Sequence, residues 1–278
     1  MVKVWLRFCF TLMVTLEFDY FRSMKRSTLH FILLICFSGS MAYAQVVPLA
    51  NAHAHNDYEH TRPLKDALSF GFTSVEADIY LINGELYVSH NYPRDLKGIT
   101  LKELYLDPLQ QLLKANSDKV YPNYKGVFYL MIDFKSAAAP TYQKLHELVS
   151  TYPEFKDNQN FKIYLSGQDL LYTLPLKGRI MAVDGRPKDV SGSYSTEEMP
   201  VISESFVGVS GWNTRDEITE EQWKKVKDFI DAVHKAGKKC RLWATPDNEK
   251  TWKRLQSYKM DFINTDKLKE LSDFLKKS

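Results

Sequence analysis

The alternation of short apolar runs with longer amphipathic segments constrains the fold of this chain more than any other feature. From Val46 onward, runs rich in β-branched and aromatic residues recur, and most of them precede a segment with helical periodicity. This rhythm is typical of βα units around a parallel sheet. It predicts eight strands, at residues 47–52, 73–79, 127–134, 161–166, 179–183, 206–210, 239–244 and 261–264.

The segments between these runs predict seven helices. They lie at residues 62–70, 100–116, 138–152, 168–174, 220–236, 249–257 and 267–276. Thr219 and Gln222 form a capping-box pattern before the fifth of these helices, and Gly237 is a typical residue to follow its end. Residues 184–204 contain Gly, Pro and Ser without helical period, so we expect a loop with at most a short helix.

Eight βα units in about 230 residues match the size of a TIM (β/α)8 barrel. No Pro-, Gly- or Ser-rich linker interrupts the series, so we expect a single α/β domain over residues 45–278, with an irregular fifth connection. Asn83-Gly84 is a strong hairpin signal, and it predicts a small β-hairpin inserted after the second strand, with His90 at its end.

The first 44 residues have the pattern of a leader. Lys25 and Arg26 precede the apolar run at 29–37, and Ala42 and Ala44 are the small residues that a signal peptidase requires. We therefore expect a signal peptide at about 24–44 with cleavage after Ala44, a misassigned upstream extension at 1–23, and an exported protein in the periplasm or outside the cell.

Removal of the leader changes the charge of the chain. The leader holds five of the 37 basic residues and two of the 34 acidic ones, so 32 of each sign remain. A neutral chain offers no electrostatic reason to bind nucleic acid. Cys240 becomes the single cysteine, which excludes an intramolecular disulfide. We expect a monomer with no stable membrane span.

Two pairs of polar residues have the spacing that places both members on one strand face. They are His53 with His55, and Glu76 with Asp78. Two buried carboxylates side by side require a cation or a proton, whereas a solvated face would make them ordinary surface residues. Asp133 favours a site, because the carboxyl ends of barrel strands meet at one rim.

Three carboxylates at one rim, from Glu76, Asp78 and Asp133, would form a hard-oxygen site suited to one divalent cation, Mg²⁺ or Ca²⁺. Beside it, His55 and His90 could act as general base and general acid on a phosphodiester. Lys135 lies on the strand face of Asp133 and would add a positive charge for a phosphoryl oxygen. This set predicts metal-assisted phosphodiester cleavage.

Four motifs carry a resemblance to a known family. They are His55-Asn56, the run from Ala67 to Asp78 with Gly71-Phe and Val75-Glu76-Ala-Asp78, Leu86-Tyr-Val-x-His90, and Met131-Ile-Asp133-Phe-Lys135. Together they resemble the glycerophosphodiester phosphodiesterase and phosphatidylinositol-phospholipase C-like superfamily, including its sphingomyelinase D branch. The segment from Asp261 to Asp266 is similar to the last strand of that family, so the resemblance spans nearly the whole mature chain.

The resemblance implies a TIM barrel that hydrolyses a glycerophosphodiester- or phospholipid-like substrate, either a small molecule or a lipid headgroup. A neighbouring substrate hydroxyl would attack the phosphate and release a cyclic phosphate. The implied site residues are His55 and His90 as the acid–base pair, Glu76, Asp78 and Asp133 as metal ligands, Lys135 and Asn56 at the phosphate, and Trp243 as a pocket wall.

The chain departs from the family pattern in ways that bear on the substrate more than on the chemistry. Where the family has His-Arg-Gly, this chain has His55-Asn56-Asp57, so a phosphate-binding arginine is missing and Asn56 can serve only as a neutral donor. His53 is assigned a supporting role. Arg186 and Trp212 follow the fifth and sixth expected strands and are further candidates for substrate contact.

Two alternatives remain open. His53-x-His55 with Asp266 also resembles the metal signature of amidohydrolases, but that family needs further histidine ligands from the middle strands, and none occurs between His146 and His234. The second alternative is a non-catalytic barrel that binds a phosphorylated or glycan ligand in a degenerate site. The missing arginine favours it, and the complete set of histidines and carboxylates opposes it.

Overall fold

The computed structural model describes residues 46–96 and 99–277. The expected signal peptide, its cleavage site after Ala44 and the upstream extension lie outside the described residues. Val46–Ser278 forms one compact unit. Within the described part of this unit, no helix is long and apolar enough to cross a membrane.

Parallel strands and helices alternate along this unit. The strands are β1 (Leu49–Ala54), β2 (Phe72–Ile82), β3 (Glu85–Val88), β4 (Phe128–Phe134), β5 (Phe161–Ser166), β6 (Ala182–Gly185), β7 (Val201–Ser205), β8 (Lys239–Trp243) and β9 (Ile263–Thr265). The α-helices are α3 (Lys65–Phe70), α4 (Asp107–Ala115), α5 (Ala138–Val149), α6 (Phe206–Ser210), α7 (Glu220–Lys235), α8 (Glu249–Ser257) and α9 (Leu268–Lys276).

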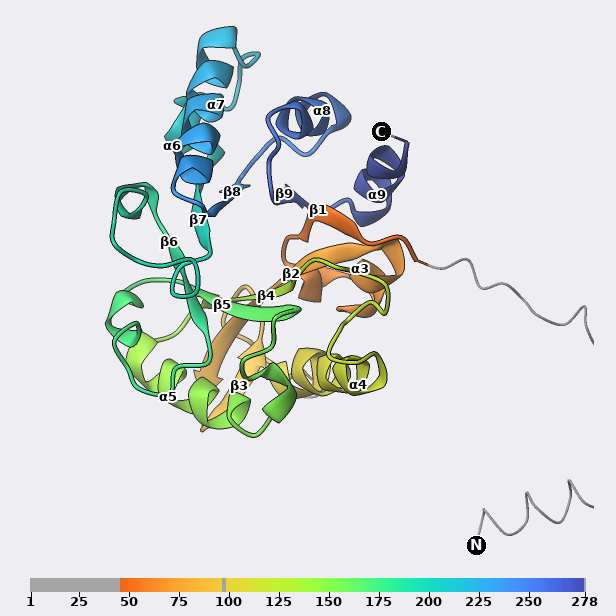
Figure 1. The fold of residues 1–278 in the computed structure, drawn as a ribbon, viewed down its shortest axis with the longest axis vertical. Coiled ribbons are helices and arrows are strands. Elements are labelled where there is room, and N and C mark those ends of the chain that lie inside the picture. Colours follow the sequence, from red (N-terminus) through yellow and green to blue (C-terminus); the bar gives the residue numbers. More distant parts are fainter. Residues whose placement is uncertain (1–45, 97–98, 278) are drawn as a thin grey trace, which may run out of the picture. The chain divides into compact units, whose positions relative to one another are not determined.

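Eight strands in the described residues form a nearly closed parallel barrel. Their order is β8-β7-β6-β5-β4-β2-β1-β9, and an isolated parallel bridge between Arg241 and Phe262 joins the two ends. The labels in Figure 1 follow this ring, with the helices outside it. The hairpin strand β3 pairs antiparallel with β2, and its turn residues Asn83 and Gly84 both have positive φ. The predicted TIM barrel and its hairpin are therefore confirmed.

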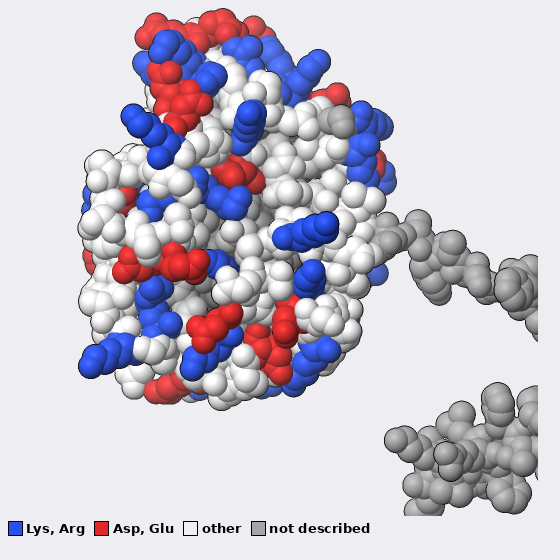
Figure 2. Space-filling model, viewed as in Figure 1, with Lys and Arg blue, Asp and Glu red and all other residues white. Residues whose placement is uncertain are grey.

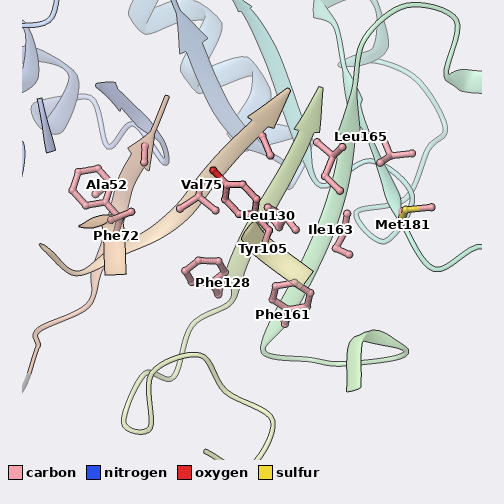
Figure 3. Packing of buried hydrophobic residues seen from close by; sticks show 14 of the residues in the cluster. Ala52, Phe72, Val75, Tyr105, Phe128, Leu130, Phe161, Ile163, Leu165 and Met181 are labelled. Atoms are coloured by element: carbon pink, nitrogen blue, oxygen red, sulfur yellow. The ribbon is translucent and has the colours of Figure 1, made fainter. Parts of the chain in front are cut away.

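The alternation of side chains along the strands separates two cores. Odd-numbered residues of β2, such as Val75, and even-numbered residues of β4, such as Leu130, belong to the large apolar cluster packed against the helices. Figure 3 shows this layer around Phe128, Phe161 and Tyr105. A second, smaller cluster forms from Tyr129, Met131, Tyr164, Ala182, Val201 and Phe262. The other face of each strand therefore points into the barrel, where the polar residues of the motifs also lie.

Most predicted elements match the structure within a few residues, but two are wrong. The sixth expected strand, 206–210, is the short helix α6, and the strand is Val201–Ser205 instead, of which all but Ser205 lies in the segment expected to be a loop. The reason is local: Ser205 caps α6 by accepting a hydrogen bond from the Gly208 amide at 2.8 Å. Of the helix expected at 168–174, only a 3-10 turn at Leu171–Thr173 forms.

Charged side chains of both signs are mixed on the surface. In the face shown by Figure 2, lysine and arginine are interspersed with aspartate and glutamate. Exposed pairs at helical i,i+4 spacing, such as Lys224 with Asp228 and Lys269 with Asp273, also place opposite charges side by side. The view is consistent with the balanced charge of residues 45–278.

Asp57 ties the loop after β1 to the segment before α4. Its Oδ2 accepts hydrogen bonds from the Leu64 amide at 2.6 Å and the Tyr105 hydroxyl at 2.7 Å. Its Oδ1 is buried without a hydrogen-bond partner among the described residues. Burial raises the pKa of Asp57 from 3.8 to about 6, despite the hydrogen bonds that lower it.

We predict that Asp57→Asn removes a pH dependence of stability. Because the folded pKa lies above the unfolded one, the protonated carboxyl favours folding below about pH 4, and this contribution is lost as the pH rises through 6. A shift of about two pKa units corresponds to about 3 kcal/mol. Urea unfolding should show that the wild type loses about this much stability between pH 4 and pH 8 and that the variant does not. The difference in free energy of unfolding between variant and wild type should therefore shift in favour of the variant by about this amount. Parallel pH profiles would contradict the prediction.

Candidate active site

A pocket of about 340 Å³ opens at the carboxyl ends of the barrel strands. Its lining residues come from positions far apart in the sequence but from neighbouring strand ends. They are His55, Asn56, Glu76, His90, Met131, Asp133, Lys135, Ser166, Arg186, Glu204, Arg241 and Trp243. A larger hollow of about 570 Å³ between α8 and α9 contains no histidine. The first pocket is therefore the candidate site.

His55 follows β1 and is held by a carboxylate from the far end of the chain. Its Nδ1 lies 2.7 Å from Oδ1 of Asp266, the residue after β9. Burial lowers the pKa of His55, but the hydrogen bond to Asp266 and the charges of Glu76 and Asp266 outweigh it and raise the pKa above 6.5. With Nδ1 bound to Asp266, Nε2 is the nitrogen left for a ligand.

His90 is held in the same way from the other side. It follows the β2–β3 hairpin, where the Ser89 amide donates to the Asp78 carbonyl at 3.1 Å. Its Nδ1 lies 3.0 Å from Asp78 Oδ2, and its side chain is about half exposed, at 51%. The pocket therefore has two imidazoles, each bound to a carboxylate through Nδ1.

Asp78 and Asp133 are register partners on β2 and β4, and Lys135 bridges them. Lys135 Nζ lies 3.0 Å from Asp78 Oδ2 and 2.7 Å from Asp133 Oδ2. Burial lowers the pKa of Lys135, but Asp133 and Asp78 raise it well above its usual range, so the ammonium stays charged. Burial and the charge of Glu76 raise the pKa of Asp78, although Lys135 opposes them.

Glu76 is neutralised by a buried arginine from across the barrel. Arg241 Nη2 donates to Glu76 Oε2 at 2.5 Å, and Arg241 Nε donates to Asn264 Oδ1 at 3.0 Å. His53 lies between Ser74 Oγ at 2.7 Å and the same glutamate oxygen at 3.2 Å. Burial opposes ionisation of Glu76, but Arg241 and His53 hold its pKa well below the usual range.

The structure brings the predicted site residues to one rim, with two of them behind the pocket wall. Asp78 does not line the pocket but contacts His90 and Lys135, which do. His53 is fully buried beneath Glu76, and burial together with Arg241 lowers its pKa to about 4, so it is neutral. This placement suits the supporting role expected for it. Trp243 is 43% exposed at the end of β8 and forms part of the wall.

Sequence reasoning missed Tyr58 and Arg241. The Tyr58 hydroxyl lies 2.9 Å from Asn56 Oδ1 and 2.8 Å from Asp78 Oδ2, which links the first motif to the second. Nothing in the sequence around Tyr58 indicates this contact. Arg241 had a signal, because a charged residue inside an apolar strand and two residues before Trp243 must share the inner face with that tryptophan.

The carboxylates of the site are ligands that a hard divalent cation prefers, but their side chains are not arranged around one. Among the described residues, no group of three or more His, Cys, Asp or Glu side chains is placed to hold a metal ion. Three carboxylates nevertheless lie at one rim, and Asp78 Oδ1 is buried with no hydrogen-bond partner among the described residues, while its Oδ2 contacts Tyr58, His90 and Lys135. A cation at Asp78 Oδ1 would satisfy the unpaired oxygen.

Comparisons with known proteins agree with this fold. The model of the AIM6-like phosphodiesterase domain matches residues 41–169, which contain the predicted catalytic and metal-binding residues but not Trp243, Arg186 or Trp212. Altered inheritance of mitochondria protein 6 of Candida glabrata is 30% identical over 82% of this chain and 72% of its own length. Its homologue in Arthroderma benhamiae is 27% identical over 80% of this chain and 82% of its own length.

Solved structures extend the similarity of the fold. A glycerophosphodiester phosphodiesterase from Parabacteroides distasonis superposes with a TM-score of 0.50 at 17% identity, over 82% of this chain and 97% of its own. One from Agrobacterium tumefaciens gives 0.50 at 14%, over 83% and 100%. This chain thus shares the TIM-barrel fold of these structures. Together with the match to the AIM6-like phosphodiesterase domain, it confirms the superfamily predicted from the motifs. Within it, this chain belongs to the Altered inheritance of mitochondria protein 6 family.

We predict that Arg241→Met destabilises the barrel through Glu76. The variant leaves a buried carboxylate without its partner, which should cost about 3–5 kcal/mol in urea unfolding. Adding Glu76→Gln should recover part of this loss, with a coupling of about 0.5–3 kcal/mol in a double-mutant cycle. As a control, Arg62→Met breaks the i,i+4 pair of an exposed arginine with Asp66 and should cost at most about 1 kcal/mol. If the double variant loses as much stability as the two single variants together, the pairing of Arg241 with Glu76 is contradicted.

Proposed function

We propose that this chain is a metal-dependent phosphodiester hydrolase acting on a glycerophosphodiester- or phospholipid-like substrate. The observation that carries the proposal is the pair of imidazoles, His55 and His90, each bound through Nδ1 to a carboxylate at one pocket rim. General acid–base catalysis needs two such groups on opposite sides of the reacting phosphorus, each with a free nitrogen. The AIM6-like phosphodiesterase model and the phosphodiesterase fold support the same reaction class.

In the proposed reaction, Nε2 of one histidine accepts the proton of an attacking hydroxyl, from water or from the substrate itself. The hydroxyl oxygen bonds to phosphorus, the bond from phosphorus to the leaving oxygen breaks, and the imidazolium of the other histidine gives that oxygen a proton. When the hydroxyl belongs to the substrate, the first product is a cyclic phosphate. Asp266 and Asp78 stabilise the imidazolium forms.

We propose one divalent cation, Mg²⁺ or Ca²⁺, bound by Glu76, Asp78 and Asp133. The cation would polarise a phosphoryl oxygen and neutralise developing charge. The partnerless Asp78 Oδ1 supports this assignment. Lys135 contacts Oδ2 of Asp78 and of Asp133 and also lines the pocket, so its ammonium would meet a phosphoryl oxygen beside the cation. Asn56 and Trp243 complete the substrate contacts.

The leader pattern supports export of the mature chain to the periplasm or the cell exterior, and we propose that it acts there as a monomer without nucleic acid.

The competing function is ligand binding without catalysis. This alternative is supported because Arg241 and Lys135 already neutralise the charges of Glu76, Asp78 and Asp133 without a metal ion. Hydrolysis assays separate the two.

We predict that the chain hydrolyses bis(p-nitrophenyl) phosphate, glycerophosphodiesters or lysophospholipids in the presence of Mg²⁺ or Ca²⁺, and that EDTA abolishes the reaction. His55→Ala and His90→Ala should each lower kcat by about 10²–10⁴-fold, with an unchanged thermal unfolding midpoint. Glu76→Gln should weaken metal binding measured by calorimetry. Binding of these compounds without hydrolysis of any phosphodiester would instead establish the non-catalytic barrel.

We predict that Asp266→Asn shifts one limb of the pH–rate profile to lower pH. The hydrogen bond to Asp266 raises the pKa of His55, so its weakening lowers that pKa. If the acidic limb moves, His55 is the base, and if the alkaline limb moves, it is the acid. Asp261→Asn is a matched control, because Asp261 holds His234 at 2.7 Å but does not line the pocket. An unchanged profile in the Asp266 variant would exclude His55 from proton transfer.

A further inference from the structure

Two arginines line the pocket, and they differ in how far their side chains are exposed to a ligand. Arg241 is 3% exposed, and its guanidinium binds Glu76, Asn264 and His53 within the barrel. Its role is to neutralise the floor of the site. Arg186, which follows β6, is different because its side chain is 36% exposed at the pocket wall.

The contacts of Arg186 orient the guanidinium without using all of it. Nη1 donates to Asp184 Oδ2 at 2.7 Å and to the Gly185 carbonyl at 3.2 Å, and Nη2 donates to Ser166 Oγ at 3.3 Å. A guanidinium has five N–H groups. Among the described residues, the Nε–H of Arg186 and the second N–H of its Nη2 have no partner.

The support beneath Arg186 is rigid. The Asp184 side chain is fully buried, and its Oδ1 accepts a hydrogen bond from Ser203 Oγ at 2.7 Å. The Arg186 amide donates to Asp189 Oδ2 at 2.9 Å, which closes the 3-10 turn Pro187–Asp189. A side chain fixed at one edge by a buried carboxylate presents its other edge in a defined direction.

The free edge of the guanidinium faces the part of the rim that carries Asp133 and Lys135. Ser166, which Nη2 contacts, is the register partner of Asp133 on the neighbouring strand β4. The guanidinium therefore extends from β6 over the end of β5, toward the rim where Asp133 and Lys135 line the same pocket. Asn56, on the other side of this pocket, is neutral.

We propose that Arg186 binds a non-bridging oxygen of the scissile phosphate and supplies the guanidinium that the His55-Asn56-Asp57 motif lacks. The proposal rests on the proposed function and deepens it. A guanidinium with one donor on Nε and one on Nη2 forms a fork that matches two oxygens of a phosphate. It would stabilise the negative charge that develops on those oxygens as the phosphodiester is attacked.

The test compares Arg186→Met, Arg186→Lys, Arg186→Ala and Lys188→Met with the wild type. Lys188 has the same charge in the same turn but does not line the pocket, so its variant is the matched control. Binding of inorganic phosphate is measured by calorimetry, and turnover of bis(p-nitrophenyl) phosphate by steady-state kinetics. Circular dichroism and thermal unfolding verify that each variant is folded.

Arg186→Met should weaken phosphate binding by at least about tenfold and lower kcat/KM by about 10²–10³-fold. Arg186→Lys should recover only part of the loss, because an ammonium cannot form the fork. Lys188→Met should match the wild type. Free guanidinium ion at millimolar concentration should restore turnover to Arg186→Ala but not increase that of the wild type.

Two outcomes would overturn the assignment. One is a folded Arg186→Met variant with wild-type phosphate affinity and kcat/KM. The other is a loss confined to substrates with a second anionic group, which would place Arg186 at the leaving alcohol. If the wild type hydrolyses no phosphodiester, the proposed function fails, but the calorimetric comparison still decides whether Arg186 binds phosphate.

Discussion

The burial of two carboxylates on the inner face of β2 is the constraint on which the rest of the site depends. Glu76 is 5% exposed and Asp78 is fully buried, and they share one strand face. Such a pair requires nearby cations or a proton. Arg241 comes from β8 to meet Glu76, and Lys135 comes from the end of β4 to meet Asp78. Residues from both halves of the barrel therefore neutralise the two buried carboxylates of β2.

This arrangement divides the barrel into two levels. The smaller apolar cluster, with Tyr129, Tyr164 and Phe262, fills one part of the interior, and a polar network from His53 to Arg241 forms the floor of the pocket. Above the floor, the ends of β1 to β4 contribute the two histidines and three carboxylates of the motifs, while the ends of β6, β7 and β8 contribute Arg186, Glu204 and Trp243. The histidines and carboxylates of the motifs thus lie on one side of the ring, and Arg186 and Trp243 lie on the other.

The fold was largely predictable because binary patterning is a local property. The runs at β4 and β5 are apolar and β-rich, and their predicted bounds agree with the structure within one residue. Prediction failed at β7, where Val201–Ser205 is followed at once by the apolar helix α6. Residues 206–210 read as a strand, and only the hydrogen bond of Ser205 to Gly208, with the pairing of β7 and β8, separates the two elements.

For the site, the sequence by itself determined which residues carry ionisable groups and, through the period of two, which of them share a strand face. Glu76 with Asp78 and Asp133 with Lys135 follow from that period alone. Only the tertiary structure decided the partners. Asp266 reaches His55 across 211 positions, and Arg241 reaches Glu76 across 165. Strand order and barrel closure bring these residues together, and no local pattern contains that information.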